Sequence, residues 1–340
     1  MQEDRQKRTI RRRTFLSQMA MGTGLALGHW GCQPTKQITH LRIGINDWIG
    51  YAIARYAEKA GIMEKRGLQI DLIEFVNLQD ATRAMLKGSL DATFATIWDL
   101  MSTNVTSAQA VMLLITNVSH GSDGIVARYP LKSMKDLRGK KVGVKLGTVN
   151  ELILLEALKL HKISPKVIKM IDISNEIAAN ELRNNKIDAA VMWQPLLSEI
   201  AKEIQGSIVY TTKDQDSLVV DILATTSQTF QAKEADFRQF ILAWFDTIAI
   251  LKQEPEIILQ FLKKELGHSR DSLIESYAGI KLGNIALNRQ MLGQPQNINL
   301  VLSQINDLLI ENNHSPSIAS PIIIPSDFFN SSLDQWKTLP

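Results

Sequence analysis

Residues 41–95 read LRIGINDWIGYAIARYAEKAGIMEKRGLQIDLIEFVNLQDATRAMLKGSLDATFA, and this stretch decides the fold. Three short runs rich in apolar residues, at 41–45, 68–75 and 91–95, predict strands. The two segments between them carry apolar residues at helical spacing, and each helical pattern ends at a glycine. Because strands that alternate with helices form parallel sheets covered on both faces, the stretch predicts an α/β unit.

The same pattern returns later in the chain. KVGVK at 141–145 repeats RIGIN at 42–46 at an offset of 99, and residues 178–191 match residues 81–94 at an offset of 97. Each repeated strand is followed by a helical pattern. Two similar α/β units are therefore expected in tandem.

Two further runs, at 124–127 and 218–224, predict strands that leave the first unit and return to it. The chain that follows, from 232 to 311, is mainly helical in pattern. We therefore expect two α/β lobes, each a mostly parallel sheet flanked by helices, with two crossing strands as the hinge. The predicted lobes are 41–126 with 220–340, and 127–219. The alternative is two consecutive domains followed by a helical tail.

Residues 1–32 predict an export signal. They carry six basic and two acidic side chains, and the apolar stretch at 19–27 is about ten residues long, too short to span a bilayer. RRTFL at 12–16 resembles the twin-arginine export pattern. Cys32 lies where bacterial lipoprotein signals place the lipidated cysteine. We expect a periplasmic or extracytoplasmic protein that touches the membrane only through such a lipid; a disordered basic tail is the alternative.

The charge and the cysteine content exclude several classes of partner. The chain has 38 basic and 35 acidic residues, and without residues 1–32 the numbers are 32 and 33, so no basic surface argues for nucleic acid or an anionic membrane. One cysteine allows no internal disulfide and no cysteine cluster for a metal. The six histidines lack the spacing of a metal site. We expect no cofactor and no metal.

Candidate ligand-binding residues follow the predicted strands. Ligands of open parallel sheets bind beyond the carboxyl ends of the strands. Three of the six tryptophans lie in the short segments after strands, with aspartates beside them. Tryptophan gives a rigid apolar wall, and a few polar groups orient a small ligand. These candidates are Asp47, Trp48, Trp98, Asp99, Asp123, Gly147, Thr148, Trp193, Gln194 and Asp221.

Each candidate also has a purely structural interpretation. A tryptophan after a strand often packs against the edge of a lobe, and Asp47 or Thr148 can cap the helix that follows. Gly147-Thr148 at a helix start can offer backbone N–H groups to a carboxylate. Several acidic side chains, with Lys145 as the main basic one, favour an amine-bearing or zwitterionic ligand over nitrate or a sulfonate.

Signals of catalysis are weak. The chain contains no G-x-S-x-G elbow, Walker loop or G-x-G-x-x-G fingerprint. His120 with Asp123 could act as acid and base, although a loop histidine without a nucleophile is more often a hydrogen-bonding residue. No catalytic residue is therefore assigned.

Several motifs resemble the periplasmic substrate-binding proteins of ABC importers of the nitrate/taurine/sulfonate type. They are Trp48 with Tyr51, LKGSLDA at 86–92, DGIVA at 123–127, KDLRGKKVGV at 135–144, Gly147-Thr148 and Trp193-Gln194-Pro195, and the similarity runs over residues 41–282. The resemblance implies the type II-like periplasmic-binding-protein fold, in which two α/β lobes close on a ligand. It places Trp48, Trp98, Asp123, Thr148 and Trp193 on the cleft and adds Tyr51. Gln194 departs from the family, where many members carry Glu.

The resemblance implies a function as well. We expect an exported, monomeric binding protein that captures a small solute and delivers it to an ABC permease driven by a separate ATPase. One alternative is an enzyme on the same scaffold, either a lyase or a relative of the thiamine-pyrimidine synthases, whose cysteine-rich motif this chain lacks after Cys32. Another is a sensory ligand-binding protein.

Overall fold

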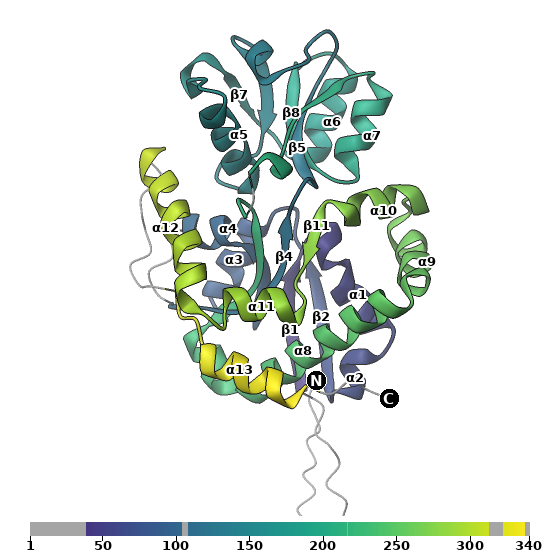
Figure 1. The fold of residues 1–340 in the computed structure, drawn as a ribbon, viewed down its shortest axis with the longest axis vertical. Helices are drawn as coiled ribbons and strands as arrows, with labels where there is room; N and C mark the ends of the chain where they lie inside the picture. Colours follow the sequence, from purple (N-terminus) through teal and green to yellow (C-terminus); the bar gives the residue numbers. More distant parts are fainter. Residues whose placement is uncertain (1–38, 104–107, 216, 313–321, 337–340) are drawn as a thin grey trace, which may run out of the picture. The chain divides into compact units, whose positions relative to one another are not determined.

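The computed structural model describes residues 39–103, 108–215, 217–312 and 322–336. The predicted export signal, with Cys32, lies outside these residues. In the part of the chain that is described, no helix is both long enough and apolar enough to cross a bilayer. Two β-sheets with helices around them make up the described residues (Figure 1).

The first sheet has six strands. They are β1 (Thr39–Ile45), β2 (Leu68–Glu74), β3 (Ala92–Thr96), β4 (Ala110–Ser119), β10 (Val220–Thr226) and β11 (Ile280–Leu282), in the spatial order β11-β4-β10-β3-β1-β2. β1 runs parallel to β2 and β3, whereas β10 runs antiparallel to β3 and β4, and β11 runs antiparallel to β4. The parallel part is the α/β unit that residues 41–95 predict.

The second sheet has five strands. They are β5 (Asp123–Ala127), β6 (Lys141–Val144), β7 (Lys169–Asp172), β8 (Ala189–Trp193) and β9 (Ser207–Thr211), in the order β7-β6-β8-β5-β9. β6 is parallel to β7 and β8, and β5 is antiparallel to β8 and β9. This sheet repeats the parallel arrangement β2-β1-β3 of the first as β7-β6-β8.

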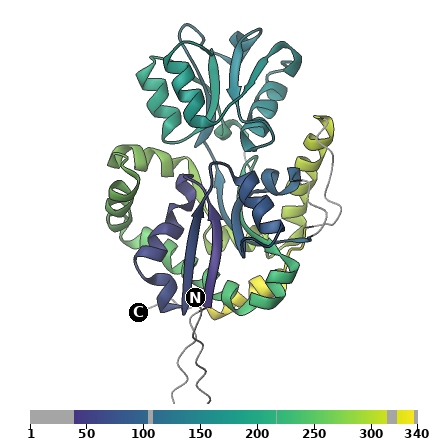
Figure 2. The same cartoon turned by 180° about the vertical axis from the view of Figure 1, so that it is seen from behind.

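Helices lie on both sides of the first sheet (Figures 1 and 2). α3 packs against β1 and β3, and α8 packs against α1 and α2. Their bounds, with those of the remaining α-helices, are α1 (Ala52–Lys59), α2 (Ile62–Lys65), α3 (Leu78–Leu86), α4 (Ile97–Ser102), α5 (Val149–Leu160), α6 (Asn175–Arg183), α7 (Leu196–Glu203), α8 (Ser227–Gln253), α9 (Pro255–Leu266), α10 (Arg270–Ala278), α11 (Ile285–Met291), α12 (Pro295–Glu311) and α13 (Ser326–Gln335).

The chain passes between the sheets twice, from β4 to β5 and from β9 to β10. The predicted α/β fold class is confirmed, with one correction: both sheets are mixed and not mostly parallel. The strands on either side of each passage pair antiparallel with their neighbours, because the chain enters the second sheet and returns to the first in the opposite direction. The lobe boundaries at 126/127 and 219/220 stay a prediction.

The core beside the ends of β1 and β3 is aromatic. Phe94 lies fully buried between Tyr51 and Trp244, with ring centroids 4.6 Å and 6.2 Å away. Trp98 is fully buried as well. Close packing of these rings fixes the end of the first sheet from which the site is built.

The repeated glycine has the same role in both sheets. A Cβ atom added at Gly44 in β1 would lie 3.1 Å from Cβ of Ala81 in α3, and one added at Gly143 in β6 would lie 3.2 Å from Cβ of Ala178 in α6. Both contacts are tighter than a normal carbon contact of about 3.5–4.0 Å. The offsets of 99 and 97 in the sequence therefore mark two equivalent places where a helix packs directly onto a glycine of a parallel strand.

Gly44→Ala should lower the free energy of unfolding by about 1–3 kcal/mol, because the new methyl group overpacks the contact between β1 and α3. Urea denaturation measures this. Ser89→Ala, at an exposed position, should stay within about 0.5 kcal/mol of the wild type. A Gly44→Ala protein as stable as the Ser89→Ala protein would contradict the packing described.

Candidate functional site

Two adjoining pockets lie where the carboxyl ends of the parallel strands of both sheets meet. They share Asn46, Leu78, Val149 and Trp193 as lining residues. The outer pocket reaches the exposed Val76. The inner pocket is lined by side chains that are almost all buried. Together they form a candidate ligand site built from both sheets.

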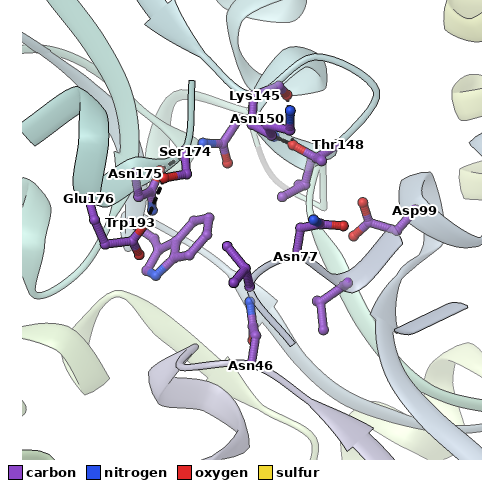
Figure 3. A pocket seen from close by; sticks show the side chains of 13 residues that line it. Asn46, Asn77, Asp99, Lys145, Thr148, Asn150, Ser174, Asn175, Glu176 and Trp193 are labelled. Atoms are coloured by element: carbon purple, nitrogen blue, oxygen red, sulfur yellow. Dashed lines mark hydrogen bonds between the residues drawn. The ribbon is translucent and has the colours of Figure 1, made fainter. Parts of the chain in front are cut away.

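The outer pocket is drawn in Figure 3. Its lining residues follow β1, β2 and β3 of the first sheet and β6 and β7 of the second, and Trp193 is the last residue of β8. They are Asn46, Val76, Asn77, Leu78, Asp99, Lys145, Thr148, Val149, Asn150, Ser174, Asn175, Glu176 and Trp193. The inner pocket is lined by Asn46, Trp48, Leu78, Thr96, Asp123, Val149, Trp193, Val219 and Asp221.

Three buried carboxyl groups face these pockets, and we call Asp99, Asp123 and Asp221 the carboxyl cluster. Their exposed fractions are 1%, 3% and 2%. Asp123 is the first residue of β5 and Asp221 lies in β10, so the two strands that follow the passages between the sheets carry the two carboxyls of the inner pocket. Asp99 belongs to the first turn of α4.

Each carboxyl of the cluster keeps one oxygen without a hydrogen-bond partner among the described residues: Asp99 Oδ1, Asp123 Oδ2 and Asp221 Oδ2. The other oxygen of Asp221 accepts a hydrogen bond from the hydroxyl of Tyr51, and Asp99 Oδ2 accepts one from Thr96 Oγ1 at 2.7 Å. A buried polar atom without a partner is costly. The unpartnered oxygens are therefore places where a donor from a ligand would be favourable.

Burial also changes how these carboxyls titrate. Burial raises the pKa of Asp99 to about 6 and the pKa of Asp123 to about 7, although hydrogen bonds from Thr96 and Ser119 oppose the shift. Burial raises the pKa of Asp221 well above its usual value, and the nearby charges of Asp123 and Asp99 add to the effect. With a pKa of about 7, Asp123 is therefore about half protonated at neutral pH when no cation lies beside it.

Two asparagines face the outer pocket, and we call Asn150 and Asn175 the amide pair. Asn150 Nδ2 donates to Asn175 Oδ1 at 2.9 Å and to the carbonyl of Val191 at 3.3 Å. Their exposed fractions are 2% and 4%. Asn150 Oδ1 and Asn175 Nδ2 have no hydrogen-bond partner among the described residues. The pair thus offers one acceptor and one donor to a ligand.

Two of the predicted tryptophans line the pockets. Trp48 is buried in the wall of the inner pocket, and its Nε1 donates to Asn117 Oδ1 at 3.2 Å. Trp193 is partly exposed and lines both pockets. In Figure 3 its indole lies between Asn175 and Asn46. Trp193 therefore offers an aromatic face to a ligand.

Thr148 lines the outer pocket, but the N–H groups at the start of α5 are used by the chain itself. Gly147 N–H donates to Glu151 Oε2 at 2.7 Å, and Asn150 N–H donates to Thr148 Oγ1 at 3.3 Å. The N–H of Val149 lowers the pKa of Asp99, which lies at this helix end. Few backbone N–H groups at the start of α5 therefore remain to bind an anion.

The other predicted residues lie away from the lining of the two pockets. Trp98 is buried in the core, Asp47 is exposed, and Tyr51 reaches the site only through its bond to Asp221. The carbonyl of Gly147, in the loop between β6 and α5, accepts from Gln79 Nε2 in α3 at 2.8 Å and from Ser102 Oγ in α4 at 3.3 Å. The side chain of Gln194 contacts α7, where its Nε2 donates to Ser198 Oγ at 2.6 Å.

Sequence reasoning missed the amide pair, Ser174 and Glu176. Three of these residues follow β7, a strand of only four residues, KMID, whose apolar signal is weak. Asn150 lies in the first turn of a helix, where a polar residue is usually taken as a capping group. A search for polar residues in the first turn after every strand, β7 included, would have found them.

Asp123→Asn should flatten the dependence of stability on pH. The raised pKa of Asp123, about 7 against an ordinary 3.8, means that its protonated form stabilises the fold at low pH and that this contribution is lost as pH rises toward and through 7. Between pH 5 and pH 8 the ligand-free wild type should lose about 2–3 kcal/mol more than Asp123→Asn in urea denaturation. Asp136→Asn is the control. The pKa of this exposed carboxyl is lowered, so Asp136 stays ionised between pH 5 and pH 8 and its replacement should leave the pH dependence unchanged. Parallel losses in wild type and Asp123→Asn would contradict the assignment.

Solved structures share this fold. The alkanesulfonate-binding protein SsuA from Xanthomonas axonopodis pv. citri, bound to MOPS, superposes with a TM-score of 0.69 at 15% identity, over 84% of this chain and 96% of that one. The periplasmic aliphatic sulphonate-binding protein SsuA from Escherichia coli gives 0.68 at 19% identity, over 87% and 99%. The desulfurization enzyme DSZB gives 0.63 at 14% identity, over 87% and 99%. At such identities the likeness shows the fold alone, and this fold carries both binding proteins and an enzyme.

Sequence comparison gives the family. Proteins named as candidate binding proteins in Brucella abortus and Brucella suis are 31% identical over 200 residues, which is 58% of this chain and 60% of the length of those relatives. The model of the family described as NMT1/THI5-like matches residues 49–258, more than half of the chain. The resemblance found in the sequence motifs is confirmed at the level of family and fold, and the chain belongs to the NMT1/THI5-like family.

Proposed function

We propose that this protein is the extracytoplasmic solute-binding component of an ABC importer and that its solute is small, polar and amine-bearing or zwitterionic. The observation that carries the proposal is the carboxyl cluster, three buried carboxyls with one unpartnered oxygen each at the two pockets. The binding-protein names of the Brucella relatives and the periplasmic binding proteins of the same fold support the class. The solute would pass to a membrane permease driven by a separate ATPase.

An amine fits the cluster better than an anion does. An ammonium group has three donors and no acceptor, so it can meet several unpartnered carboxylate oxygens with charge-assisted hydrogen bonds. Among the residues that line the two pockets, four are acidic and only Lys145 is basic. Lys145 already pairs with Asp172, at 3.0 Å. An anionic head group would therefore bind only while these carboxyls stay protonated, and it would meet uncompensated negative charge once they ionise.

The proposed mechanism is capture by closure of the two predicted lobes, 41–126 with 220–340 and 127–219. The hydrogen bonds from Gln79 in α3 and Ser102 in α4 to the carbonyl of Gly147 join these helices to the loop between β6 and α5. The two passages between the sheets, at residues 120–122 and 212–219, form the proposed hinge. Because Asp123 and Asp221 lie on the strands beside these passages, a cation bound there would tie both strands to one ligand.

We propose binding and not turnover. His120, the one candidate acid–base partner of Asp123, does not line either pocket. Its backbone N–H donates to Gly279 at 2.8 Å. Export through residues 1–32, lipidation at Cys32 and a monomeric state belong to the same proposal.

The test of the function is a thermal-shift screen of the purified protein against amines, amino acids, taurine, other sulfonates, nitrate, bicarbonate and pyrimidines. A ligand at about 100 times its dissociation constant should stabilise the fold by about 2.7 kcal/mol, several degrees in melting temperature. We expect a cationic or zwitterionic compound to stabilise the protein. Stabilisation by sulfonate or nitrate alone would contradict the proposed solute, and product formed from a stabilising compound would contradict the proposed class.

Affinity for the stabilising amine should rise between pH 6 and pH 8. The bound cation requires ionised carboxylates, and the raised pKa of Asp123, about 7, means that part of the binding energy is used to remove its proton below that pH. The dissociation constant should fall by up to about tenfold per pH unit below 7 and level off above it. Isothermal titration calorimetry at fixed ionic strength measures this. An affinity that falls as pH rises is the signature of an anion and would refute the amine.

Trp193→Ala should lower the affinity for the ligand, whereas Trp98→Ala should lower the stability of the fold. Trp193 is partly exposed on the pocket wall, so its loss should weaken amine binding by about tenfold or more and change stability little. Trp98 is fully buried, so its loss should cost about 3–5 kcal/mol of unfolding free energy. Calorimetry and urea denaturation of both variants check this. Trp193→Ala with unaltered affinity would remove Trp193 from the site.

A further inference from the structure

The orientation of the amide pair is fixed by the fold. A backbone carbonyl only accepts hydrogen bonds, so the atom of Asn150 that lies 3.3 Å from the carbonyl of Val191 must be its donor, Nδ2. The same Nδ2 lies 2.9 Å from Asn175, which must therefore present Oδ1. The atoms left over, Asn150 Oδ1 and Asn175 Nδ2, are an acceptor and a donor.

Both leftover atoms are buried and have no hydrogen-bond partner among the described residues. Both asparagines line the outer pocket, and their side chains lie against each other there (Figure 3). The carboxyl cluster offers acceptors, while the amide pair offers an acceptor together with a donor. The two parts of the site therefore present different hydrogen-bonding patterns to a ligand.

We infer that the solute carries, besides its amine, a neutral group with a hydrogen-bond donor next to an acceptor, such as a carboxamide or a urea, and that Asn150 and Asn175 bind this group. The inference rests on the proposed function and specifies its solute. The carbonyl of the ligand would accept from Asn175 Nδ2, and its N–H would donate to Asn150 Oδ1. Two such hydrogen bonds can form side by side, as they do between two amides.

A carboxylate or a second ammonium group in place of this neutral group would fit the amide pair poorly. A carboxylate has only acceptors, so it would leave Asn150 Oδ1 facing a negative oxygen, in a pocket that already holds Asp99 and Glu176. A second ammonium has only donors, so it would leave Asn175 Nδ2 without a partner. A site with buried polar groups discriminates strongly against ligands that leave them unpaired.

The test uses three matched series of probes on the full protein. The first is ω-amino carboxamides with one to five methylene groups, and the others are the ω-amino acids and the α,ω-diamines of the same lengths, with simple alkylamines as the reference. Calorimetry measures each dissociation constant. At the best length we expect the amino carboxamide to bind at least about tenfold more tightly than the matched acid, diamine and alkylamine.

Asn175→Asp then exchanges the donor for an acceptor and keeps the oxygen that accepts from Asn150. We expect the variant to lose at least about tenfold in affinity for the amino carboxamide and to gain affinity for the diamine, whose second ammonium now meets a carboxylate. Asn180→Asp is the matched control: it makes the same charge change in α6 at an exposed position, and it should leave all affinities within twofold. If Asn175→Asp does not fold, Asn175→Ala should bring the carboxamide and alkylamine of equal length within about threefold of each other.

The outcomes separate this inference from the proposed function. Amines that bind with no preference for the carboxamide, or a preference that Asn175→Asp leaves unchanged, would overturn the inference and leave the amine-binding function in place. Binding of nitrate or sulfonates with no binding of any amine series would overturn the proposed function, and the inference with it.

Discussion

The constraint on which the site depends is the burial of carboxyl groups on the strands that connect the two sheets. Asp123 begins β5 and Asp221 lies in β10, and neither can move without moving the connection between the sheets. Burying a carboxylate is expensive unless it is paired, protonated or bound to a cation. The hydroxyl of the buried Tyr51 donates to Asp221, and burial raises the pKa of both carboxyls. The unliganded state therefore holds protons that a bound cation can replace.

A second feature of the site is that side chains of the chain itself interact with the N–H groups at the start of α5. A helix N-terminus beside a pocket is a natural place for an anion. Here Glu151 and the hydroxyl of Thr148 accept hydrogen bonds from N–H groups at the start of α5, and Asp99 lies beside them. Acidic side chains of the chain itself thus lie at this helix end, in a protein that shares its fold with the sulfonate-binding SsuA proteins. The solute proposed for this chain differs from a sulfonate, and the shared fold allows this because the fold fixes the position of the pocket and the side chains fix its charge.

Much of the fold could be predicted from the sequence, because its signal is periodic. The repeat around Gly44 and Gly143 identified both parallel units, and the structure shows why the glycine recurs: Ala81 and Ala178 pack onto it. The mixed character of the sheets was missed, since apolar runs show that strands exist and do not show the direction in which they pair.

The site was predicted only in part, for reasons that lie in local geometry. α4 begins directly at the end of β3, so the helical period turns Thr96 and Asp99 toward the pockets and Trp98 into the core. A rule that selects every residue after a strand cannot separate these directions. Asn150 and Asn175 escaped notice because their roles depend on the Val191 carbonyl, which only the folded chain brings near.

The central claim is that a cation replaces protons in the carboxyl cluster, and proton counting tests it most directly. Titration of the best amine from the screen by calorimetry at pH 6.5, in buffers of different ionisation enthalpy, gives the number of protons exchanged on binding. We expect a net release of protons, because the raised pKa of Asp123 must fall when the cation binds. A net uptake of protons, or none, would contradict it.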